Sequence, residues 1–592
     1  MRFPAREVKI GEIGIGGNNP IRLQSMTNTD TADVKATIEQ CIRIFDAGAD
    51  YARISIPTLK NIQHLKEIKS GLLQNGYKKP IIADIHFNPE IALEAARIVE
   101  KIRINPGNYI DKNQKGNAIL TDTDYSIELE KMEQKLYPLI EVCKEYGTAI
   151  RVGTNFGSLS SRIIAKFGNT PLAMAEATME FLRIFEKHNY KNTIISLKAS
   201  NPLIMIQSYG LIIKKLLEEN ILCPIHLGVT EAGDGENGRI KSALGISTLL
   251  KEGIGDTIRV SLSEPPENEI PVAKLIAEPF QKKFSIIGKN EKYIIPDFNI
   301  RQNTFNIPFG QKAIVISGFS NEYFSNKTKE TLHPDYIYID DEKEIKDGNK
   351  RFIVNSEIIK QKENTNVFPL INIENLKEVD FHKEINFINV EDISLLNKLN
   401  LTKEINSPVI ILNLSKKENY SNIYSDLSYN RDFPIVLRLR YDESVIDEFI
   451  IKLTTDISRL LIERRVQGLW IENDKIEHQK VTEIVYGLLQ ASGIRISKTE
   501  FISCPTCSRT TYDLQKLLAK VQLEFADYPG IKIAVMGCMV NGPGEMADSD
   551  FGFIGAREGN VTLYAGKDIL LRNISLDKAI DELKKRLNNL KS

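Results

Sequence analysis

Cysteine is scarce in this chain, and neither sign of charge dominates. The 592 residues include 6 cysteines, and the formal net charge is −1 at pH 7. So few cysteines argue against a secreted disulfide scaffold, and the near-neutral balance gives no overall attraction to nucleic acid or membranes. No apolar run reaches about 18 residues, so we expect no transmembrane helix. The N-terminus carries no apolar signal core and no Ser/Arg-rich leader, so we expect a cytoplasmic protein.

A chain of this length is expected to form several domains. In its N-terminal part a short β-branched strand, a turn and an amphipathic helix alternate repeatedly. Eight strands are predicted there, at residues 21–26, 51–56, 80–85, 101–106, 148–153, 192–200, 223–229 and 256–262. This count is typical of an α/β protein with a (β/α)8 TIM barrel, which we assign to residues 1–270; a doubly wound open sheet is the alternative.

The glycine-containing stretch at residues 8–19 precedes the first barrel strand. A Gly-x-Gly phosphate loop should follow a strand and open a helix. Here Gly14 and Gly16 are followed by Pro20 and then by another strand. The stretch therefore predicts a β-hairpin that plugs the bottom of the barrel, rather than a dinucleotide site.

Residues 290–490 are richer in Asn, Lys, Ile and Glu, and they carry a second series of strand patterns. These lie at 312–318, 335–340, 351–355, 367–373, 386–390, 408–414, 433–439 and 467–472. Because some gaps are too short for a full helix, we predict an inserted, degenerate barrel-like α/β domain. Its strand-end charges, Arg438, Arg440 and Glu472, form no ring of cations, which favours a spacer or dimerisation role. Residues 493–592 predict a small α+β domain.

Cationic side chains recur where the N-terminal strands end. Barrel enzymes place their reactive groups at these C-terminal strand ends. The cations are Arg53, Arg103, Arg151, Lys198 and Arg259. Buried cations repel one another and are costly to desolvate without counter-ions. Their convergence predicts a polyanionic ligand, most simply a diphosphate held by bidentate arginines; the alternative is that each cation pairs with a nearby Asp or Glu.

Other polar residues fall at the same strand ends. Asp84 and His86 have the chemistry to orient hydroxyls or transfer protons, although such a histidine can also be a hydrogen-bonded core residue. Glu231, after the seventh strand, is the preferred acid–base group. The remaining candidates for contact with a ligand are Asn105, Asn155, His226 and Ser261.

Three cysteines and one glutamate lie in two short C-terminal stretches, at residues 504–507 and 538–545. Thiolates suit iron–sulfur clusters or zinc. A structural zinc would need a fourth Cys or a His nearby, and residues 493–592 contain neither. A redox dithiol would not use the third Cys and lacks its strand–helix context. Iron–sulfur ligation by Cys504, Cys507 and Cys538, with Glu545 completing the site, fits best.

At these positions the sequence resembles the 4-hydroxy-3-methylbut-2-en-1-yl diphosphate synthase family. The resemblance covers residues 1–270 and 490–592, and the segment between them is similar to the insert of the long form known from plants and some bacteria. The plastid leader of plant members is missing, which favours a bacterial cytoplasmic enzyme. The motifs that carry the resemblance are Gln24–Thr27, Asn105–Asn108, Arg151–Asn155, Val229–Gly233, Cys504–Cys507 and Asn541–Glu545.

The resemblance implies a [4Fe–4S] cluster held by Cys504, Cys507, Cys538 and Glu545. The implied reaction is a two-electron reductive opening of 2-C-methyl-D-erythritol 2,4-cyclodiphosphate, with loss of a hydroxyl as water, to (E)-4-hydroxy-3-methylbut-2-enyl diphosphate. Glu231 would manage protons, and Glu545 would yield its place on the fourth iron to substrate. The substrate would be held by Asn541 of the cluster domain and by the barrel residues named above.

The family also implies ferredoxin or flavodoxin as electron donor, and we expect a homodimer. In the short form, the cluster domain of one subunit covers the barrel of its partner. The insert leaves open whether the two domains meet within one chain here. Two rival interpretations remain: a non-redox barrel with a structural zinc, which predicts colourless protein, and an electron-transfer or scaffold module with an inactive barrel.

Overall fold

The computed structural model divides into two compact units, one formed by Met1–Asp297 with Lys498–Ser592 and the other by Phe298–Ser497. Among the described residues, no helix is both long and apolar enough to cross a bilayer. The structure describes residues 1–109, 122–281, 293–296, 298, 313–318, 332–340, 350–358, 366–376, 379, 381–396, 405–415, 427, 433–507, 510, 512–538, 542–546, 549–556 and 559–591.

A parallel barrel forms the N-terminal part of the first unit. Eight described strands run in the order β8-β7-β6-β5-β4-β3-β10-β9, and a parallel bridge from Ile195 to Ile225 brings β8 beside the segment that leads into β9. This confirms the predicted barrel over an open sheet. The strands are β3 (Arg22–Met26), β4 (Tyr51–Ile56), β5 (Ile81–Ile85), β6 (Lys101–Ile104), β7 (Ala149–Asn155), β8 (Thr193–Lys198), β9 (His226–Leu227) and β10 (Thr257–Ile258).

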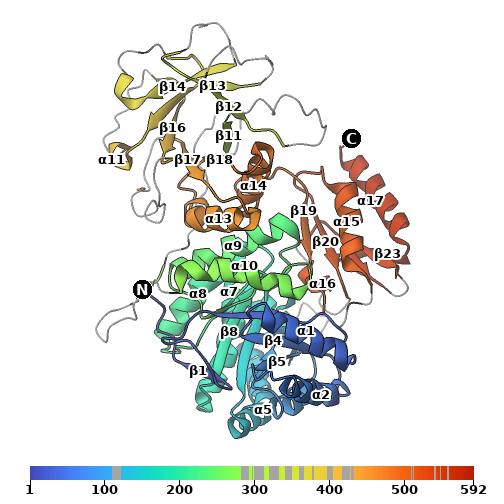
Figure 1. Ribbon diagram of the computed structural model, residues 1–592. Coiled ribbons are helices and arrows are strands. Elements are labelled where there is room, and N and C mark those ends of the chain that lie inside the picture. Colours follow the sequence, from blue (N-terminus) through green and yellow to red (C-terminus); the bar gives the residue numbers. More distant parts are fainter. Residues whose placement is uncertain are drawn as a thin grey trace. The chain divides into compact units, whose positions relative to one another are not determined.

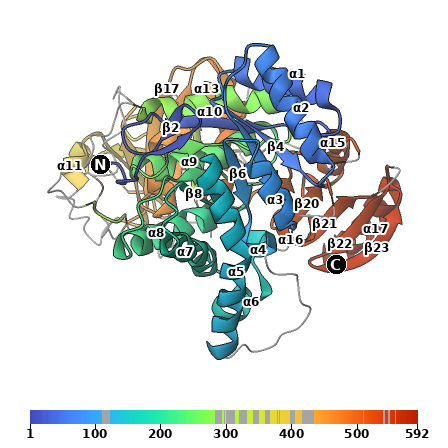
Figure 2. The ribbon, with the colours of Figure 1, turned by 90° about the horizontal axis from the view of Figure 1, so that it is seen from below.

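Helices surround these strands (Figures 1 and 2). Their starts are fixed locally: the Asp33 side chain accepts a hydrogen bond from the amide of Ala36, and Thr170 accepts one from Ala173 ahead of Pro171. The helices are α1 (Val34–Asp46), α2 (Asn61–Gln74), α3 (Pro89–Ala96), α4 (Pro106–Tyr109), α5 (Asp122–Tyr146), α6 (Ser161–Phe167), α7 (Pro171–Lys187), α8 (Pro202–Glu218), α9 (Gly235–Lys251) and α10 (Glu269–Ala277).

An antiparallel hairpin closes the bottom of the barrel. Its strands are β1 (Val8–Ile10) and β2 (Ile13–Ile15). The prediction of a plug is confirmed, because the apolar side chains of the hairpin share one core cluster with residues at the starts of four barrel strands. That cluster contains Val8, Ile10, Ile15, Tyr51, Ile82, Ala149 and Ile194.

The C-terminal part of the first unit is a small α+β domain. Its described strands form a five-stranded sheet, in which the first three are parallel and the last two antiparallel. Helices α15 (Leu514–Phe525) and α17 (Leu576–Lys591) bury their apolar stripes in its main core cluster. The strands are β19 (Glu500–Ser503), β20 (Lys532–Met536), β21 (Phe551–Gly555), β22 (Val561–Ala565) and β23 (Asp568–Ile574), and the short helix α16 (Gly542–Glu545) follows β20.

The second unit contains a second barrel. All eight of its described strands pair in parallel and close completely, around a core that includes Trp470 and Phe368. Described helices are α11 (Ile393–Leu396), α13 (Ile446–Ile462) and α14 (His478–Ala491). The strands are β11 (Ile314–Gly318), β12 (Tyr336–Ile339), β13 (Phe352–Asn355), β14 (Val367–Asn372), β15 (Asn386–Val390), β16 (Pro408–Asn413), β17 (Ile435–Tyr441) and β18 (Gly468–Asn473).

The charges at the strand ends of this second barrel are paired. Nη2 of Arg438 lies 2.7 Å from Oε1 of Glu472, and its guanidinium lies 3.8 Å from the Trp470 ring centre. Arg440 forms an ion pair with Asp474. These contacts fit the interpretation that the strand ends of the insert do not form a second polyanion site.

Candidate active site

A cavity of about 790 Å³, part of it open to solvent, lies between the C-terminal ends of the barrel strands and the small C-terminal domain. The barrel contributes Met26, Arg53, Asp84, His86, Arg103, Arg151, Asn155, Ser196, Lys198, Thr230, Glu231, Arg259 and Ser261. The C-terminal domain contributes Cys504, Pro505, Thr506, Cys507, Thr510, Met536, Gly537, Cys538 and Gly542.

The five predicted cations all line this cavity and are at most 9% exposed. Two of them have carboxylate partners. Arg259 holds Glu269 of α10 with Nη2 to Oε1 at 2.9 Å and Nε to Oε2 at 3.0 Å. Nη1 of Arg103 lies 3.2 Å from Oδ1 of Asp84. The predicted alternative of structural pairing therefore holds for part of the set.

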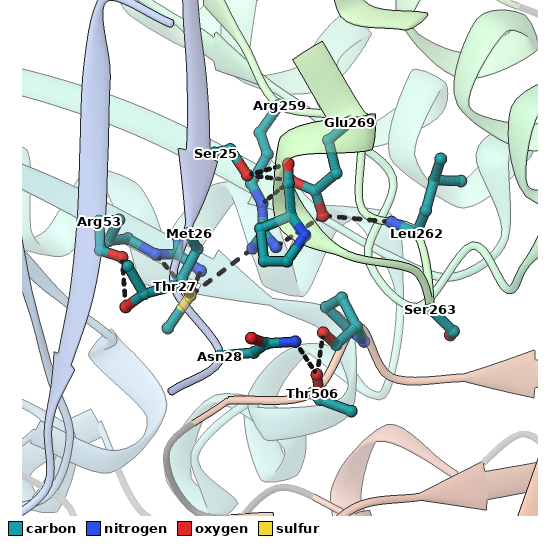
Figure 3. A network of polar contacts seen from close by, with 12 residues as sticks. Ser25, Met26, Thr27, Asn28, Arg53, Arg259, Leu262, Ser263, Glu269 and Thr506 are labelled. Carbon is teal, nitrogen blue, oxygen red and sulfur yellow. Dashed lines mark hydrogen bonds and ion pairs between the residues drawn. The ribbon is translucent and has the colours of Figure 1, made fainter. Parts of the chain in front are cut away.

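Arg53 and Arg151 face a different environment. Arg53 points Nη2 at the Met26 sulfur, 2.7 Å away, as Figure 3 shows. Nε and Nη1 of Arg151 have no hydrogen-bond partner among the described residues. Burial lowers the pKa of Arg151, and the neighbouring Arg53 and Arg103 lower it further. The mouth of the barrel therefore carries more positive charge than its carboxylates balance, as a site for a polyanion requires.

Asp84, His86 and Arg103 form one buried network. Nε2 of His86 lies 3.1 Å from Oδ2 of Asp84 and 3.1 Å from Nη1 of Arg103. Nη2 of Arg103 also donates to the carbonyl of Gly153 at 2.8 Å. Burial by itself raises the pKa of Asp84, but Arg53, His86 and Arg103 together hold it well below its usual range. Asp84 is therefore a fixed anion that orients His86 and Arg103 at the cavity wall.

Glu231 sits at the junction of the two domains. Its backbone is left-handed, with φ of 53°, and its side chain is 5% exposed at the cavity wall. The next residue, Ala232, forms a parallel bridge to Ser503 at the end of β19. Burial and then Glu231 raise the pKa of the Cys504 thiol to about 12. The carboxylate therefore acts at close range on the cysteine end of the cavity.

Cys504, Cys507 and Cys538 line the same cavity, and none of them is in a disulfide. The amide of Gly537 donates to Sγ of Cys504 at 3.1 Å. A Cβ added at Gly537 would lie 2.6 Å from Oγ1 of Thr510 and 3.2 Å from Sγ of Cys504, so only glycine leaves this space clear.

The donor set fits an iron–sulfur cluster in its chemistry. Three thiols, which are the soft ligands that such clusters take, line one and the same cavity. Within the described part of the chain, no three His, Cys, Asp or Glu side chains are grouped closely enough to hold a metal ion. The side chain of the fourth predicted ligand, Glu545, and the whole of Asn541 lie outside the described residues.

Direct contacts join the barrel and the C-terminal domain within this one chain. Nδ2 of Asn28 donates to Oγ1 of Thr506 at 3.0 Å (Figure 3), and the hydroxyls of Ser263 and Ser503 are 2.6 Å apart. A partly buried ion pair of 2.8 Å links Lys241 to Glu500. Barrel and C-terminal domain of one chain therefore suffice to line the cavity.

Two predicted ligand contacts do not reach the cavity wall. Nδ2 of Asn105 donates to Oγ of Ser158 at 2.8 Å, and its Oδ1 accepts from the amide of Gly107 at 3.1 Å, so its amide group holds a turn. His226 is fully buried below the cavity. The residues Met26, Ser196, Thr230, Thr506 and Thr510 also line the cavity and were not predicted. Met26, Thr230 and Thr506 lie inside the motifs quoted above, which was the available signal.

Comparison with known proteins identifies the family. Residues 5–274 match the GcpE TIM-barrel domain and residues 500–589 match the GcpE protein C-terminal domain. The 4-hydroxy-3-methylbut-2-en-1-yl diphosphate synthase (flavodoxin) of Phocaeicola vulgatus is 39% identical, over 98% of this chain and 97% of that protein. The same-named protein of Parabacteroides distasonis is 40% identical, over 97% and 96%.

A plant relative aligns over nearly the whole chain as well. The chloroplastic 4-hydroxy-3-methylbut-2-en-1-yl diphosphate synthase (ferredoxin) of Arabidopsis thaliana is 34% identical, over 98% of this chain and 86% of that protein. These relatives, which are named for the same synthase activity, thus align with both the barrel and the cysteine-bearing domain. The chain belongs to the 4-hydroxy-3-methylbut-2-en-1-yl diphosphate synthase family.

Proposed function

We propose that this chain catalyses the reductive ring opening of 2-C-methyl-D-erythritol 2,4-cyclodiphosphate to (E)-4-hydroxy-3-methylbut-2-enyl diphosphate, a late step of the non-mevalonate isoprenoid pathway. The observation that carries the proposal is one cavity with buried cations on its barrel side and three cysteine thiols on its other side. Such a cavity can bind a diphosphate and a redox centre next to each other.

The cations account for the substrate class. Ring opening breaks a carbon–oxygen bond and leaves its negative charge on the diphosphate. Arg53, Arg103, Arg151, Lys198 and Arg259 would neutralise that charge before it develops, which lowers the barrier without reorganisation during the step. Asn155 and Ser261 line the same wall and would donate hydrogen bonds to the phosphoryl oxygens.

The cysteines account for the redox chemistry. Cys504, Cys507 and Cys538 would hold a [4Fe–4S] cluster, with Glu545 as a displaceable fourth ligand and Asn541 near the substrate. When bound, this cluster supplies electrons and a Lewis acid to the carbon–oxygen bond. Glu231 lies at the cavity wall and acts on Cys504, so it is placed to give a proton to the departing hydroxyl. The Asp84–His86 pair would orient a substrate hydroxyl.

Partner and location follow from relatives and composition. The relatives are named for flavodoxin or ferredoxin, so we propose such a protein as the electron donor in a cytoplasmic enzyme. We further propose that residues 1–270 bind substrate and residues 493–592 bind the cluster. The inserted residues 290–490 act as a spacer or in dimerisation, and the enzyme works as a homodimer.

The test is the iron and sulfide content of anaerobically purified full-length protein, with its absorbance spectrum recorded before and after adding the cyclic diphosphate under a strong reductant. About four irons per chain, a brown colour, a substrate-dependent spectral change and the butenyl diphosphate product are expected. Zinc in place of iron, after failed cluster reconstitution, would overturn the redox function in favour of a non-redox barrel. A cluster with no binding of the cyclic diphosphate would instead indicate an electron-transfer module.

A further inference from the structure

Two titratable side chains lie inside the barrel below the cavity and take no part in lining it. Lys101 opens β6 and His226 opens β9. Both side chains are 0% exposed. Lining the cavity therefore does not explain why a titratable side chain is buried at either position.

Lys101 is a buried amine that has no counter-ion in the part of the chain that the structure describes. Its Nζ lies 4.6 Å from the centre of the Tyr51 ring, and has no hydrogen-bond partner among the described residues. The charged groups that act on it are Arg53 of β4 and Arg151 of β7. The hairpin below contributes the apolar Val8, Ile10 and Ile15 to the cluster around Tyr51.

The nearest carboxylates along the chain are engaged elsewhere. Glu100, which precedes Lys101, lies 2.6 Å from Nζ of Lys69 and accepts from the amide of Ile81 at 3.2 Å. Asp84, on the adjacent strand β5, is held by Arg103 and His86. Lys101 therefore faces two positive charges, a ring and apolar groups.

His226 has a similar environment. Its Nδ1 lies 3.4 Å from Oγ1 of Thr257 on β10, and Nε2 has no partner in the described part of the chain. Its backbone carbonyl accepts a hydrogen bond from Tyr209 of α8 at 2.8 Å. The groups that oppose a positive charge on it are basic side chains from four strands: Arg151, Lys198, Lys101 and Arg53.

Their surroundings therefore disfavour the charged form of both groups. Burial lowers the pKa of Lys101 well below its ordinary value, and Arg151 and Arg53 lower it further. Burial likewise lowers the pKa of His226, with Arg151 and Lys198 as the next causes. Negative charge placed among the same arginines would permit these groups to bind protons, because those arginines repel the protonated forms.

We propose that Lys101 and His226 are uncharged while the cavity is empty and bind protons when a diphosphate occupies the cations above them. The inference rests on the proposed function, because it requires a diphosphate at those cations. It assigns to these residues a role as proton acceptors that adjust the positive charge of the barrel to that of its ligand. The enzyme would then take up protons together with its substrate, in a reaction that releases a hydroxyl as water.

The test is calorimetric titration of the full-length enzyme with 2-C-methyl-D-erythritol 2,4-cyclodiphosphate at pH 7, without reductant. Each titration is run in two buffers of different ionisation enthalpy, neither of them phosphate. The doubly esterified phosphates of this ligand do not titrate near neutral pH, so protons taken from the buffer go to the protein. We expect an uptake of at least about half a proton per chain in the wild type.

Variants locate the uptake. Lys101→Met should reduce it, and the double variant Lys101→Met/His226→Gln should reduce it to less than about a quarter of the wild-type value. Lys131→Met, an exposed lysine on α5, is the matched control and should leave the uptake unchanged. Undiminished uptake in the double variant would overturn the proposal and direct attention to Lys198, His86 or Glu231.

If a variant does not fold, measurements on the wild type alone still test the proposed proton uptake. Proton uptake on binding requires the affinity for the cyclic diphosphate to weaken as the pH rises from 7 to 9. Binding without proton uptake and without this pH dependence would overturn the inference while leaving the proposed function intact. No binding at all would overturn both.

Discussion

Arg259 and Glu269 form a two-point ion pair inside the barrel wall, with contacts of 2.9 and 3.0 Å and side chains 3% and 1% exposed. Oε2 of Glu269 also accepts from Ser25 at 2.7 Å, and Oε1 accepts from the amide of Leu262 at 3.3 Å (Figure 3). Helix α10 thus fixes the last strand-end cation in place.

Removing the charge of Glu269 should destabilise the enzyme. Glu269→Gln leaves Arg259 buried without its counter-ion, which costs about 3–5 kcal/mol of unfolding free energy, measurable by urea unfolding. The cyclic diphosphate should restore part of the loss, since it brings negative charge to Arg259. Glu267→Gln is the control: its ion pair with Arg43 is partly exposed, so the change should stay within about 1 kcal/mol. Equal stability of the two variants would contradict the prediction.

Substitution of Arg151 should raise the stability of the enzyme and weaken its binding of the cyclic diphosphate. Arg151→Met removes a buried cation whose Nε and Nη1 lack acceptors among the described residues, so the ligand-free enzyme should gain about 1–4 kcal/mol. Affinity for the cyclic diphosphate should fall about 10- to 100-fold, because a charged hydrogen bond contributes about 1.5–3 kcal/mol. Thermal unfolding and calorimetry measure the two effects. Arg183→Met, on the outer face beside Glu219, should change neither much; unchanged affinity in Arg151→Met would refute the role.

Substitution of a cysteine that lines the cavity should remove iron, whereas substitution of a cysteine outside the cavity should not. Cys538→Ala should lose most of its iron and at least about 100-fold in turnover, since even the neighbours of metal ligands cost about 10- to 100-fold when changed. Cys41→Ala changes a fully buried thiol on α1 outside the cavity, and should keep its iron. Iron and sulfide assays of both proteins decide the point, and full iron in Cys538→Ala would remove that ligand from the site.

Lys101 should make stability depend on pH in a defined direction. An unfolded lysine keeps its proton up to about pH 10.4, whereas burial, Arg151 and Arg53 lower the pKa of folded Lys101. Between those two pKa values the unfolded chain binds more protons, so stability rises with pH. Lys101→Met lacks this contribution; it should be about 1–4 kcal/mol more stable than wild type at pH 7, and the gap should shrink toward pH 10. Urea unfolding across this range tests it, and a gap that widens with pH would be inconsistent with an uncharged Lys101.

Gly544 should control how closely the C-terminal domain approaches the barrel. A Cβ at this position would lie 2.2 Å from the carbonyl oxygen of Gly157, in the barrel. Gly544→Ala should therefore displace α16 from its contact and reduce kcat/KM about 10- to 100-fold, because a small misplacement of reacting groups is costly. Iron content should remain near wild type. Loss of iron with unchanged kcat/KM per cluster would point to cluster binding instead. Gly318→Ala, whose added Cβ would meet only Oε1 of Glu472 at 4.0 Å, controls for loss of a glycine.

The barrel strands could be predicted because strand, turn and helix repeat along the chain. The cations Arg53, Arg103 and Arg151 could be assigned to one mouth because barrel enzymes place their reactive groups at the C-terminal ends of the strands. Strands β9 and β10 are shorter than predicted. Pro224 lies within the predicted seventh strand, residues 223–229, and has no amide hydrogen to donate to the ladder, and strand β9 begins only at His226.

The sequence could not predict the partners of those cations. Glu269 lies on α10, beyond the last strand. No sequence pattern marks a carboxylate on that helix as the partner of a strand-end cation. Lys101 was overlooked because it starts its strand instead of ending it. Its spacing of two from Arg103 places both on one face, and that parity was the signal available.

The hairpin of β1 and β2 determines how molecules reach and leave the site. It packs across the starting ends of the barrel strands, so substrate and product must use the same route, past the C-terminal domain that covers the opposite end. Separation of that domain from the barrel would admit the cyclic diphosphate and release the product. It would break contacts such as Asn28–Thr506 and Ser263–Ser503, so these contacts would slow turnover as they hold the site together.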